Sequence, residues 1–398
     1  MDSKQSSGRR AAGSASTKPS SSSRTLRICG IPLHITPEQL RTSLLRLSHG
    51  SLQANDLILS LAPFHEAQVA TVTFLRGREP AQFSGCRPGH EIYALRLDGV
   101  GGNLVVDCDF YGITPLYSAK VPTVDVIAVT GLAGHAFGSW KAPGNHSMWL
   151  RDFLPLAVPG ARILTFGYDS ALKGSTCTNS IQQYSRQLLD HVSGAREKKD
   201  AYRPIVFIGH SLGGLVIKQA LVDARALRRP AKDQSILQSC TGICFFGVPH
   251  KGLNNNNLLS LVEGQQNAHL INDLREGSTL LHRLYRDFLE GFVNHDCAVT
   301  SFYETQDTAT VVEERGKWSR GGPKIRMVSM DSAMWTSPRD EMCSQIPIDK
   351  DHSNIVKFTD PQLDPTYTIV RRIIEAMVAD APAALERRRA AVRGRYAR

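Results

Sequence analysis

The pattern of apolar and polar positions divides the chain into four stretches. Residues 1–24 are polar and of low complexity, and such a stretch cannot bury enough apolar surface to fold. Residues 25–118 contain short apolar runs around one helical pattern, whereas residues 119–380 alternate longer apolar runs with helical patterns. Residues 381–398 are rich in arginine. We therefore expect a disordered leader, a small domain, a large domain and a basic tail.

In the small domain the pattern predicts a strand, a helix and then two or more strands. The helix is expected at TPEQLRTSLLRL, where Thr36 precedes a proline at the first helical position and apolar residues follow at helical spacing. This β-α-β-β order is typical of a small α+β, ferredoxin-like domain with the topology of an RNA-recognition motif.

The large domain contains apolar runs separated by helical patterns, at VDVIAVT, RILTFGY, PIVFIG, GICFFGV, AVTSFY and IRMVSM. Near-continuous apolar strands that alternate with helices indicate a mostly parallel sheet with helices on both faces, the α/β class. A last amphipathic helix, TYTIVRRIIEAMV, is expected to close this domain.

The strongest local motif is a G-x-S-x-G turn at Gly209, His210, Ser211, Leu212 and Gly213. An apolar strand precedes it and a helical pattern follows, which is the context of the nucleophile elbow in α/β-hydrolases. Glycines flank the serine because larger side chains would collide in so sharp a turn. The motif predicts that Ser211 is a nucleophile; the alternative is an ordinary glycine-rich connection between strand and helix.

A serine nucleophile of this fold needs two backbone amides that bind the oxyanion. One is expected at Leu212, directly after the serine. The other is expected at Leu132, in the glycine-rich turn that follows VDVIAVT, where Gly131 permits a tight bend. This turn could also be a plain connection, but it lacks the G-x-G-x-x-G pattern or lysine of a phosphate-binding loop.

The acid and the base of such a site follow the serine in the order acid, then histidine. His352 is the only histidine after His295, so position favours it as the base. Glu304 comes directly after the strand AVTSFY and is the favoured acid; Asp307 is the reserve. The alternative for Glu304 is a solvated loop residue.

The stretch between Gly247 and His295 contains two helical patterns, including HLINDLREGSTLLHRLYRDFLEGF. In hydrolases a cap is often inserted at this point, and its apolar face could line an acyl pocket. Plain core packing explains the same pattern equally well.

Several blocks together resemble the DUF676-type, lipase-like α/β-hydrolases, a group common in fungi and similar to the serine-active-site-containing proteins and the GPI inositol-deacylases. The blocks are VDVIAVTGLAGHAFGSW, MWLRDFLP, RILTFGYDS, RPIVFIGHSLGGLVIKQAL, ICFFGVPHKG, SFYET and DKDHSNIVKF, over roughly residues 120–380. The resemblance implies an esterase with Ser211, Glu304 and His352 as its triad. Thr130 departs from the pattern, because relatives usually carry histidine there.

The net charge of +10 comes from the two ends of the chain. Residues 1–27 hold six basic residues and one acidic residue, and residues 386–398 hold six and one as well. Solvated tails are the interpretation we favour; weak contact with an anionic membrane or RNA is the alternative. The chain lacks an apolar run long enough for a membrane helix and a secretory signal. We expect an intracellular, cytoplasmic protein, with a mitochondrial or membrane-peripheral location left open.

Eight cysteines are scattered without a C-x-x-C pair, so neither a zinc site nor a disulfide framework is predicted. The sequence therefore predicts a serine ester hydrolase with no metal or cofactor. Its substrate is expected to be an ester of a lipid or of another acyl-containing compound. The alternative is a silent hydrolase-fold adaptor that works through its N-terminal domain and basic tails. RNA binding by that domain is not expected, because Arg27, Val69 and Thr71 stand where stacking aromatic rings are needed.

Overall fold

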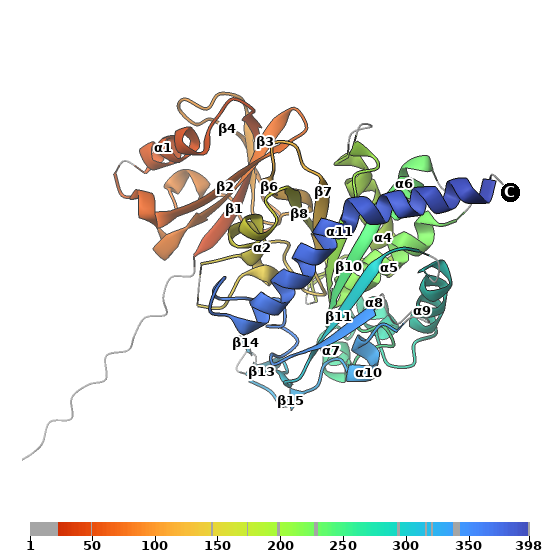
Figure 1. Cartoon of the computed structure of the whole chain (residues 1–398). Helices are drawn as coiled ribbons and strands as arrows, with labels where there is room; N and C mark the ends of the chain where they lie inside the picture. The colour runs from red at the N-terminus through yellow and green to blue at the C-terminus, as the bar shows by residue number, and fades with distance from the viewer. Residues whose placement is uncertain are drawn as a thin grey trace, which may run out of the picture.

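The computed structural model describes residues 23–48, 50–144, 146–172, 174–196, 200–226, 230–292, 295–314, 317–319, 321–336 and 343–396. Two main sheets organise these residues, a five-stranded sheet near the N-terminus and a seven-stranded sheet flanked by helices (Figure 1). Most of the expected leader, residues 1–22, lies outside the described residues, as do the last two residues of the expected tail.

The N-terminal sheet is antiparallel with the strand order β2-β3-β1-β5-β4. The expected strand, helix, strand, strand order is present, and Thr36 caps the helix by accepting a hydrogen bond from Gln39 N. Short 3₁₀ turns and β4 occupy the chain between β3 and β5, where a ferredoxin-like domain carries its second helix. The elements are β1 Arg24–Pro32, α1 Pro37–Leu47, η1 Ala54–Asp56, β2 Leu57–Phe64, β3 Ala67–Phe74, η2 Leu75–Gly77, η3 Ala81–Phe83, β4 Ile92–Leu95 and β5 Leu104–Asp107.

The two faces of this sheet have different neighbours. Leu40 and Leu44 of α1 pack with the apolar side chains on one face. On the other face Thr71 is fully buried, and Arg151 Nη1 donates hydrogen bonds to the hydroxyls of Thr71 (3.5 Å) and Thr73 (3.2 Å). Arg151 belongs to α2 (Trp149–Asp152), so the larger part of the molecule covers the face on which an RNA-recognition motif would stack bases.

The seven-stranded sheet has the order β16-β11-β10-β9-β7-β8-β6, with β6 antiparallel and the other strands parallel. This sheet, with helices on both faces and a strand–serine–helix turn after β9, is the α/β-hydrolase fold. Residues 112–118, assigned from the sequence to the small domain, form β6 and pair with β8 instead. The strands are β6 Gly112–Ser118, β7 Val124–Val129, β8 Ala161–Gly167, β9 Ile205–His210, β10 Cys240–Phe246, β11 Ala298–Glu304 and β16 Cys343–Ile348.

The prediction of a sheet strand at IRMVSM is wrong. Its position in the sheet is taken by β16, a partly polar edge strand that pairs with β11. Within 325–330, Ile325 pairs in a short ladder with Thr308, and the Met327 and Val328 amides donate to the Glu304 side chain. Apolarity alone could not show that these backbone amides bind a carboxylate rather than a neighbouring strand.

Helices on the two faces of the large sheet form two separate apolar cores. Residues of α4, α5, α6 and α9 pack on one face, and residues of α2, α3 and α11 pack on the other. The remaining elements are η4 Gly138–Trp140, α3 Leu154–Ala157, α4 Ile181–Gly194, α5 Leu212–Ala224, α6 Ala231–Ser239, α7 Asn256–Leu261, α8 Ala268–Asp273, α9 Thr279–Phe292, β12 Thr308–Ala309, β13 Val312–Glu314, β14 Lys317–Ser319, β15 Lys324–Ile325, α10 Met330–Ala333 and α11 Pro365–Tyr396.

The described part of the basic C-terminal segment is helical, and its arginines differ in exposure: Arg388 is half-buried, whereas Arg387, Arg389 and Arg393 are exposed. The closing helix α11 runs on to Tyr396, past the predicted boundary at residue 380 (Figure 1). Arg387 pairs with Asp296, and Arg388 donates to the backbone carbonyls of Cys240 (2.8 Å) and Asp296 (2.6 Å). These contacts fasten the helix to the starts of β10 and β11.

Two further observations concern the predictions from composition. All eight cysteines are unbridged. Within the described ranges, none of the helices combines the length and the apolarity that a membrane crossing requires.

Candidate active site

Ser211 sits on a sharp turn between β9 and α5. Its backbone has φ 51° and ψ −125°, a conformation that costs of order 1–3 kcal/mol for a residue with a side chain. The flanking glycines are needed for close contact: a Cβ on Gly209 would lie 2.6 Å from Gly214 Cα, and one on Gly213 would lie 2.3 Å from Val129 O. The fold therefore maintains a strained turn that presents the serine hydroxyl at the carboxyl ends of the strands.

The structure brings Ser211, His352 and Glu304 into one hydrogen-bonded row. His352 Nε2 lies 3.0 Å from Ser211 Oγ, and His352 Nδ1 lies 2.6 Å from Glu304 Oε2. All three residues are buried, with 5%, 8% and 1% of their surfaces exposed. Because the carboxylate can only accept, Nδ1 carries the proton, and the lone pair of Nε2 faces the serine hydroxyl.

The other oxygen of Glu304 is also satisfied. Glu304 ends β11, and its Oε1 accepts hydrogen bonds from the backbone amides of Met327 and Val328, both at 3.1 Å. His352 is held through its backbone, since its N–H donates to Thr308 Oγ1 (3.0 Å) and its carbonyl lies 3.0 Å from His210 Nε2. The acid and the base are therefore each fixed by contacts outside the row.

Asp307, the reserve acid, lies elsewhere. Its Oδ1 accepts from Arg326 Nε at 3.0 Å, and about half of its side chain (47%) is exposed. Arg326 also donates to the backbone carbonyls of Glu304 and Thr305, both at 2.7 Å. The geometry thus favours Glu304 over Asp307 as the partner of His352.

The turn after β7 lies directly beside the serine. A Cβ on Gly131 would come within 2.9 Å of Ser211 Cβ, so only glycine permits this approach. In the described part of the chain, the backbone N–H groups of Leu132 and Leu212 donate to no other group. The two amides predicted to bind an oxyanion are thus unengaged, and Leu212 N–H belongs to the first residue of α5.

A polar network holds this turn in place. Thr130 is fully buried and donates to Ser139 Oγ (2.9 Å), which also accepts from His135 N (2.9 Å). His135 Nε2 lies 2.7 Å from the carbonyl of Cys108, in the segment that joins β5 to β6. Thr130, the departure from the family pattern, is therefore integrated into the turn, and its hydroxyl lies against Ser139.

A cavity of about 160 Å³ opens beside Ser211 and His352. Its apolar lining comes from the turn after β7, from α7 and from neighbouring loops, and includes Leu132, Leu172, Leu253, Leu258, Leu261 and Met327. Of the segments considered as a cap, α7 lines the cavity, whereas α9 packs Leu281, Leu284 and Phe288 into the core. Core packing thus holds for α9, whereas an acyl-pocket role for α7 stays a prediction.

The sequence analysis missed the residues that hold the triad candidates. Met327 and Val328 donate through their backbone amides, so their residue types give no signal of this role. Thr308 lies in a polar stretch without a motif. Among the described residues, no group of three or more His, Cys, Asp or Glu side chains is placed to hold a metal ion.

Comparison with known proteins identifies distant relatives. No family model matches the chain. Protein SERAC1 of Bos taurus is 28% identical over 275 residues, and SERAC1 of Homo sapiens is 27% identical over 275 residues. Each match covers 62% of this chain but only 38% of the relative's length. These relatives agree with the resemblance to serine-active-site-containing proteins, whereas the DUF676 group and a fungal origin stay predictions.

Solved structures with a similar arrangement include a lipase and a lipase-esterase related protein. The mature lipase BlEst2 of Bacillus licheniformis is 13% identical, with a TM-score of 0.42 over 66% of this chain and 97% of that one. A lipase-esterase related protein from Clostridium acetobutylicum is 10% identical, with a TM-score of 0.35 over 67% of this chain and 99% of the other. The fold assignment rests on the sheet and the elbow described above.

Proposed function

We propose that this protein is a serine hydrolase that cleaves or transfers acyl esters, with Ser211 as nucleophile, His352 as base and Glu304 as its orienting acid. The observation that carries the proposal is the continuous row of hydrogen bonds, 3.0 Å from serine to histidine and 2.6 Å from histidine to glutamate. This row of hydrogen bonds ends at Ser211, which lies in a strained turn beside the unengaged backbone amides of Leu132 and Leu212. These are the parts that nucleophilic acyl transfer requires.

The reaction begins when Ser211 Oγ attacks the carbonyl carbon and its proton passes to His352 Nε2. Glu304 stabilises the resulting imidazolium and keeps the ring in place. The tetrahedral intermediate collapses, its bond to the leaving group breaks, and the leaving group takes the proton from Nε2. Water then attacks the acyl-serine ester and gives a proton to His352 Nε2. The bond between the carbonyl carbon and Ser211 Oγ breaks, Oγ takes that proton back from Nε2, and the free acid leaves.

The amides of Leu132 and Leu212 are proposed to hold the negative oxygen of the intermediate. Both are unengaged in the described structure, so they need not break another hydrogen bond before they bind. Loss of one such donor costs roughly 10²–10³ in rate in comparable sites.

The cavity beside Ser211 indicates which acyl groups fit best. It measures about 160 Å³, and five leucines supply much of its apolar lining, beside polar residues such as Thr310 and Ser353. An apolar protein cavity of about 150 Å³ holds one benzene-sized molecule. We therefore propose that short acyl chains, of roughly six carbons, fill it, and that longer lipid chains must extend past α7.

The alternative, a silent adaptor on a hydrolase scaffold, has less support. An adaptor has no use for a serine held at φ 51° or for a buried glutamate–histidine pair. The proposed membrane contact through the basic C-terminal end also lacks support at Arg387 and Arg388, because both bind the protein's own chain.

The test is hydrolysis of a p-nitrophenyl ester series from two to twelve carbons by the purified protein. We expect turnover with the best kcat/KM near six carbons. Ser211→Ala should abolish it, because the acyl-enzyme cannot form. Ser260→Ala, which changes an exposed serine of α7, is the matched control and should keep wild-type rates. Equal rates in wild type and Ser211→Ala would overturn the proposal.

A further inference from the structure

Lys218 is a buried charge-bearing residue that the proposed chemistry does not use. It lies on α5, the helix that begins directly after Ser211, and none of its surface is exposed. Among the described residues no carboxylate forms an ion pair with Lys218, and its Nζ lies within hydrogen-bond distance of His250 instead. A buried lysine without an acidic partner is costly, so what surrounds it needs an explanation.

Aromatic rings and one histidine enclose the ammonium. Nζ lies 5.0 Å from the centre of the Tyr285 ring, 5.3 Å from that of Phe288 and 5.1 Å from that of Trp335. Nζ also lies 3.2 Å from Nδ1 of the fully buried His250. Each ring within about 6 Å attracts a cation through its negative face, and more strongly where water is excluded. We call these four residues the Lys218 cage.

The cage joins α5 to three segments that come from elsewhere in the chain. Tyr285 and Phe288 belong to α9, His250 follows β10, and Trp335 follows α10. His250 also donates its backbone N–H to Ser332 O at 2.9 Å. The segment 327–335 is therefore attached to Lys218 at Trp335 directly and at Ser332 through His250.

The same segment carries the amides that hold the acid. Met327 and Val328 donate to Glu304 Oε1 at 3.1 Å, and Met327 O accepts from Asn254 N at 3.0 Å. Trp335 N donates to Ser301 Oγ of β11 at 3.1 Å, on the strand that ends at Glu304. A shift of the segment at its Trp335 end would thus reach Glu304 through the backbone.

We propose that Lys218 is a positioning residue: its caged ammonium fastens segment 327–335 to the nucleophile helix and so holds Glu304 in line with His352. This inference rests on the proposed function. Lys218 touches neither Ser211 nor the cavity, so it acts through the segment and not on the substrate.

Burial lowers the pKa of Lys218 to about 7, so Lys218 is fully an ammonium only below neutral pH. Burial, together with Lys218 and Lys251, lowers the pKa of His250 well below 6.5. His250 is therefore neutral and can accept a hydrogen bond from the ammonium. Lys251 Nζ lies 6.0 Å from the centre of the Tyr285 ring and pairs with Asp331 at 2.7 Å.

The test compares wild type with Lys218→Met, a side chain of similar length without charge. The readouts are stability in urea at pH 6, where Lys218 is mostly charged, and the rate of fluorophosphonate labelling as a function of pH. We expect stability to stay equal or rise, because a buried charge is removed. The labelling rate should fall about 10–100-fold, as for other residues that orient a reacting group. The midpoint of its acid limb should also move to lower pH, because a loosely held Glu304 stabilises the imidazolium less.

Ile236→Ala is the matched control, because Ile236 is buried in α6 and belongs to no part of the cage. It should lower stability but leave the labelling rate and midpoint of the folded protein unchanged. Trp335→Phe is the second variant in case Lys218→Met does not fold, and it should slow labelling and shift the midpoint in the same direction by less.

Two adverse outcomes are distinguishable. If wild type labels and a folded Lys218→Met or Trp335→Phe keeps the wild-type rate and midpoint, the positioning role is overturned and the hydrolase function stands. If wild type does not label at all, the hydrolase function fails, and the positioning role fails with it.

Discussion

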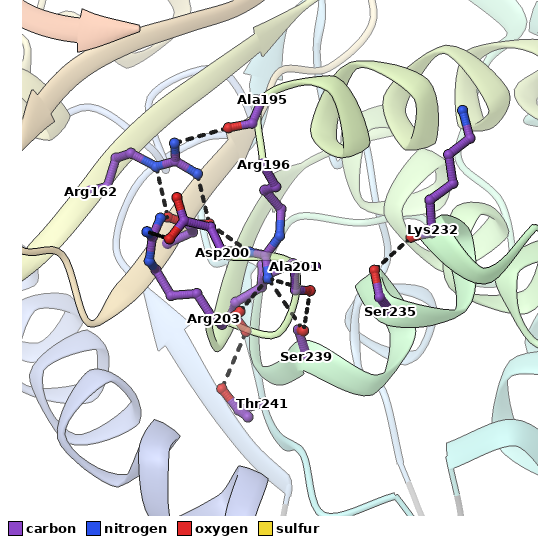
Figure 2. A network of polar contacts seen from close by, with 12 residues as sticks. Arg162, Ala195, Arg196, Asp200, Ala201, Arg203, Lys232, Ser235, Ser239 and Thr241 are labelled. Atoms are coloured by element: carbon purple, nitrogen blue, oxygen red, sulfur yellow. Dashed lines mark hydrogen bonds and ion pairs between the residues drawn. The ribbon is translucent and has the colours of Figure 1, made fainter. Parts of the chain in front are cut away.

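Two buried carboxylates lie at opposite ends of the parallel strands and have different partners. Glu304, at the carboxyl end of β11, faces one histidine and two backbone amides. Asp125, at the start of β7, faces three arginines: Arg162 Nε at 2.8 Å, Arg196 Nη1 at 2.5 Å and Arg203 Nη1 at 3.0 Å. Figure 2 shows the three arginines converging from separate segments.

The difference lies in what each carboxylate can do for its partners. Guanidinium groups stay charged, so the ion pairs of Asp125 persist near neutral pH and form a brace between β7, β8 and the chain before β9. Further hydrogen bonds complete the brace, such as that from Arg162 Nη1 to Ala195 O at 3.0 Å (Figure 2). Glu304 faces an imidazole that can gain and lose a proton. Of these two acids, only Glu304 has a partner whose charge can change near neutral pH.

The largest expected effect is on activity, in Glu304→Gln. The amide keeps the shape but cannot stabilise the imidazolium, and it favours the wrong tautomer of His352. We expect kcat to fall about 10⁴-fold, as in comparable triads, with little change in stability. Steady-state hydrolysis with far-UV circular dichroism as a folding check measures this. A loss of less than tenfold would remove Glu304 from the mechanism.

Asp125→Asn should have the opposite effect to Glu304→Gln: a large loss of stability with little change in activity. The change leaves three guanidinium groups without their carboxylate, and Arg196 is almost fully buried. Breaking a buried pair in this way costs about 3–5 kcal/mol. We expect that loss in urea unfolding, with kcat/KM of the folded protein within twofold of wild type. Asp190→Asn, in a half-exposed pair with Arg186, is the matched control and should cost less than about 1 kcal/mol.

Lowering the pH should weaken the ion pairs of Asp125. Burial alone raises the pKa of Asp125, but the ion pairs with Arg162, Arg196 and Arg203 outweigh it and hold that pKa below 3.8. Its stabilising contribution is therefore present above about pH 4 and is lost as the pH falls through the lower, folded-state pKa. Stability should drop by up to about 1.4 kcal/mol per pH unit there. Urea midpoints between pH 5 and pH 3 should fall more steeply for wild type than for Asp125→Asn, and equal slopes would contradict this.

The smallest effect is expected for Asp307→Asn. Asp307 bonds to Arg326 at a half-exposed position and does not touch His352. We expect kcat/KM to stay within about twofold of wild type and stability to change by less than about 1 kcal/mol. If this variant lost most of its activity while Glu304→Gln stayed active, Asp307 and not Glu304 would be assigned as the acid.

At the candidate site, much of the geometry could be predicted from the sequence because its requirements are local. Gly209 and Gly213 must be small for the turn to close, and Glu304 directly follows an apolar strand. His352 follows from chain order alone. The structure places these predicted residues together, and their catalytic roles stay a proposal until they are tested.

Other features could not be predicted because they depend on distant contacts. The Asp125 brace joins residues that are 37, 71 and 78 positions apart, and nothing local marks them as partners. The last arginines look solvated in sequence, yet Arg388 binds carbonyls of residues 240 and 296. The apolar run at 325–330 resembles a strand, although its amides bind Glu304 instead.

The most direct test of the central claim is fluorophosphonate labelling of wild type and Ser211→Ala, measured by intact mass. We predict a single added phosphonyl group on wild type and none on Ser211→Ala, with both proteins folded by circular dichroism. A folded wild-type protein that stays unlabelled, or a Ser211→Ala variant that labels equally, would contradict the assignment of Ser211 as an activated nucleophile.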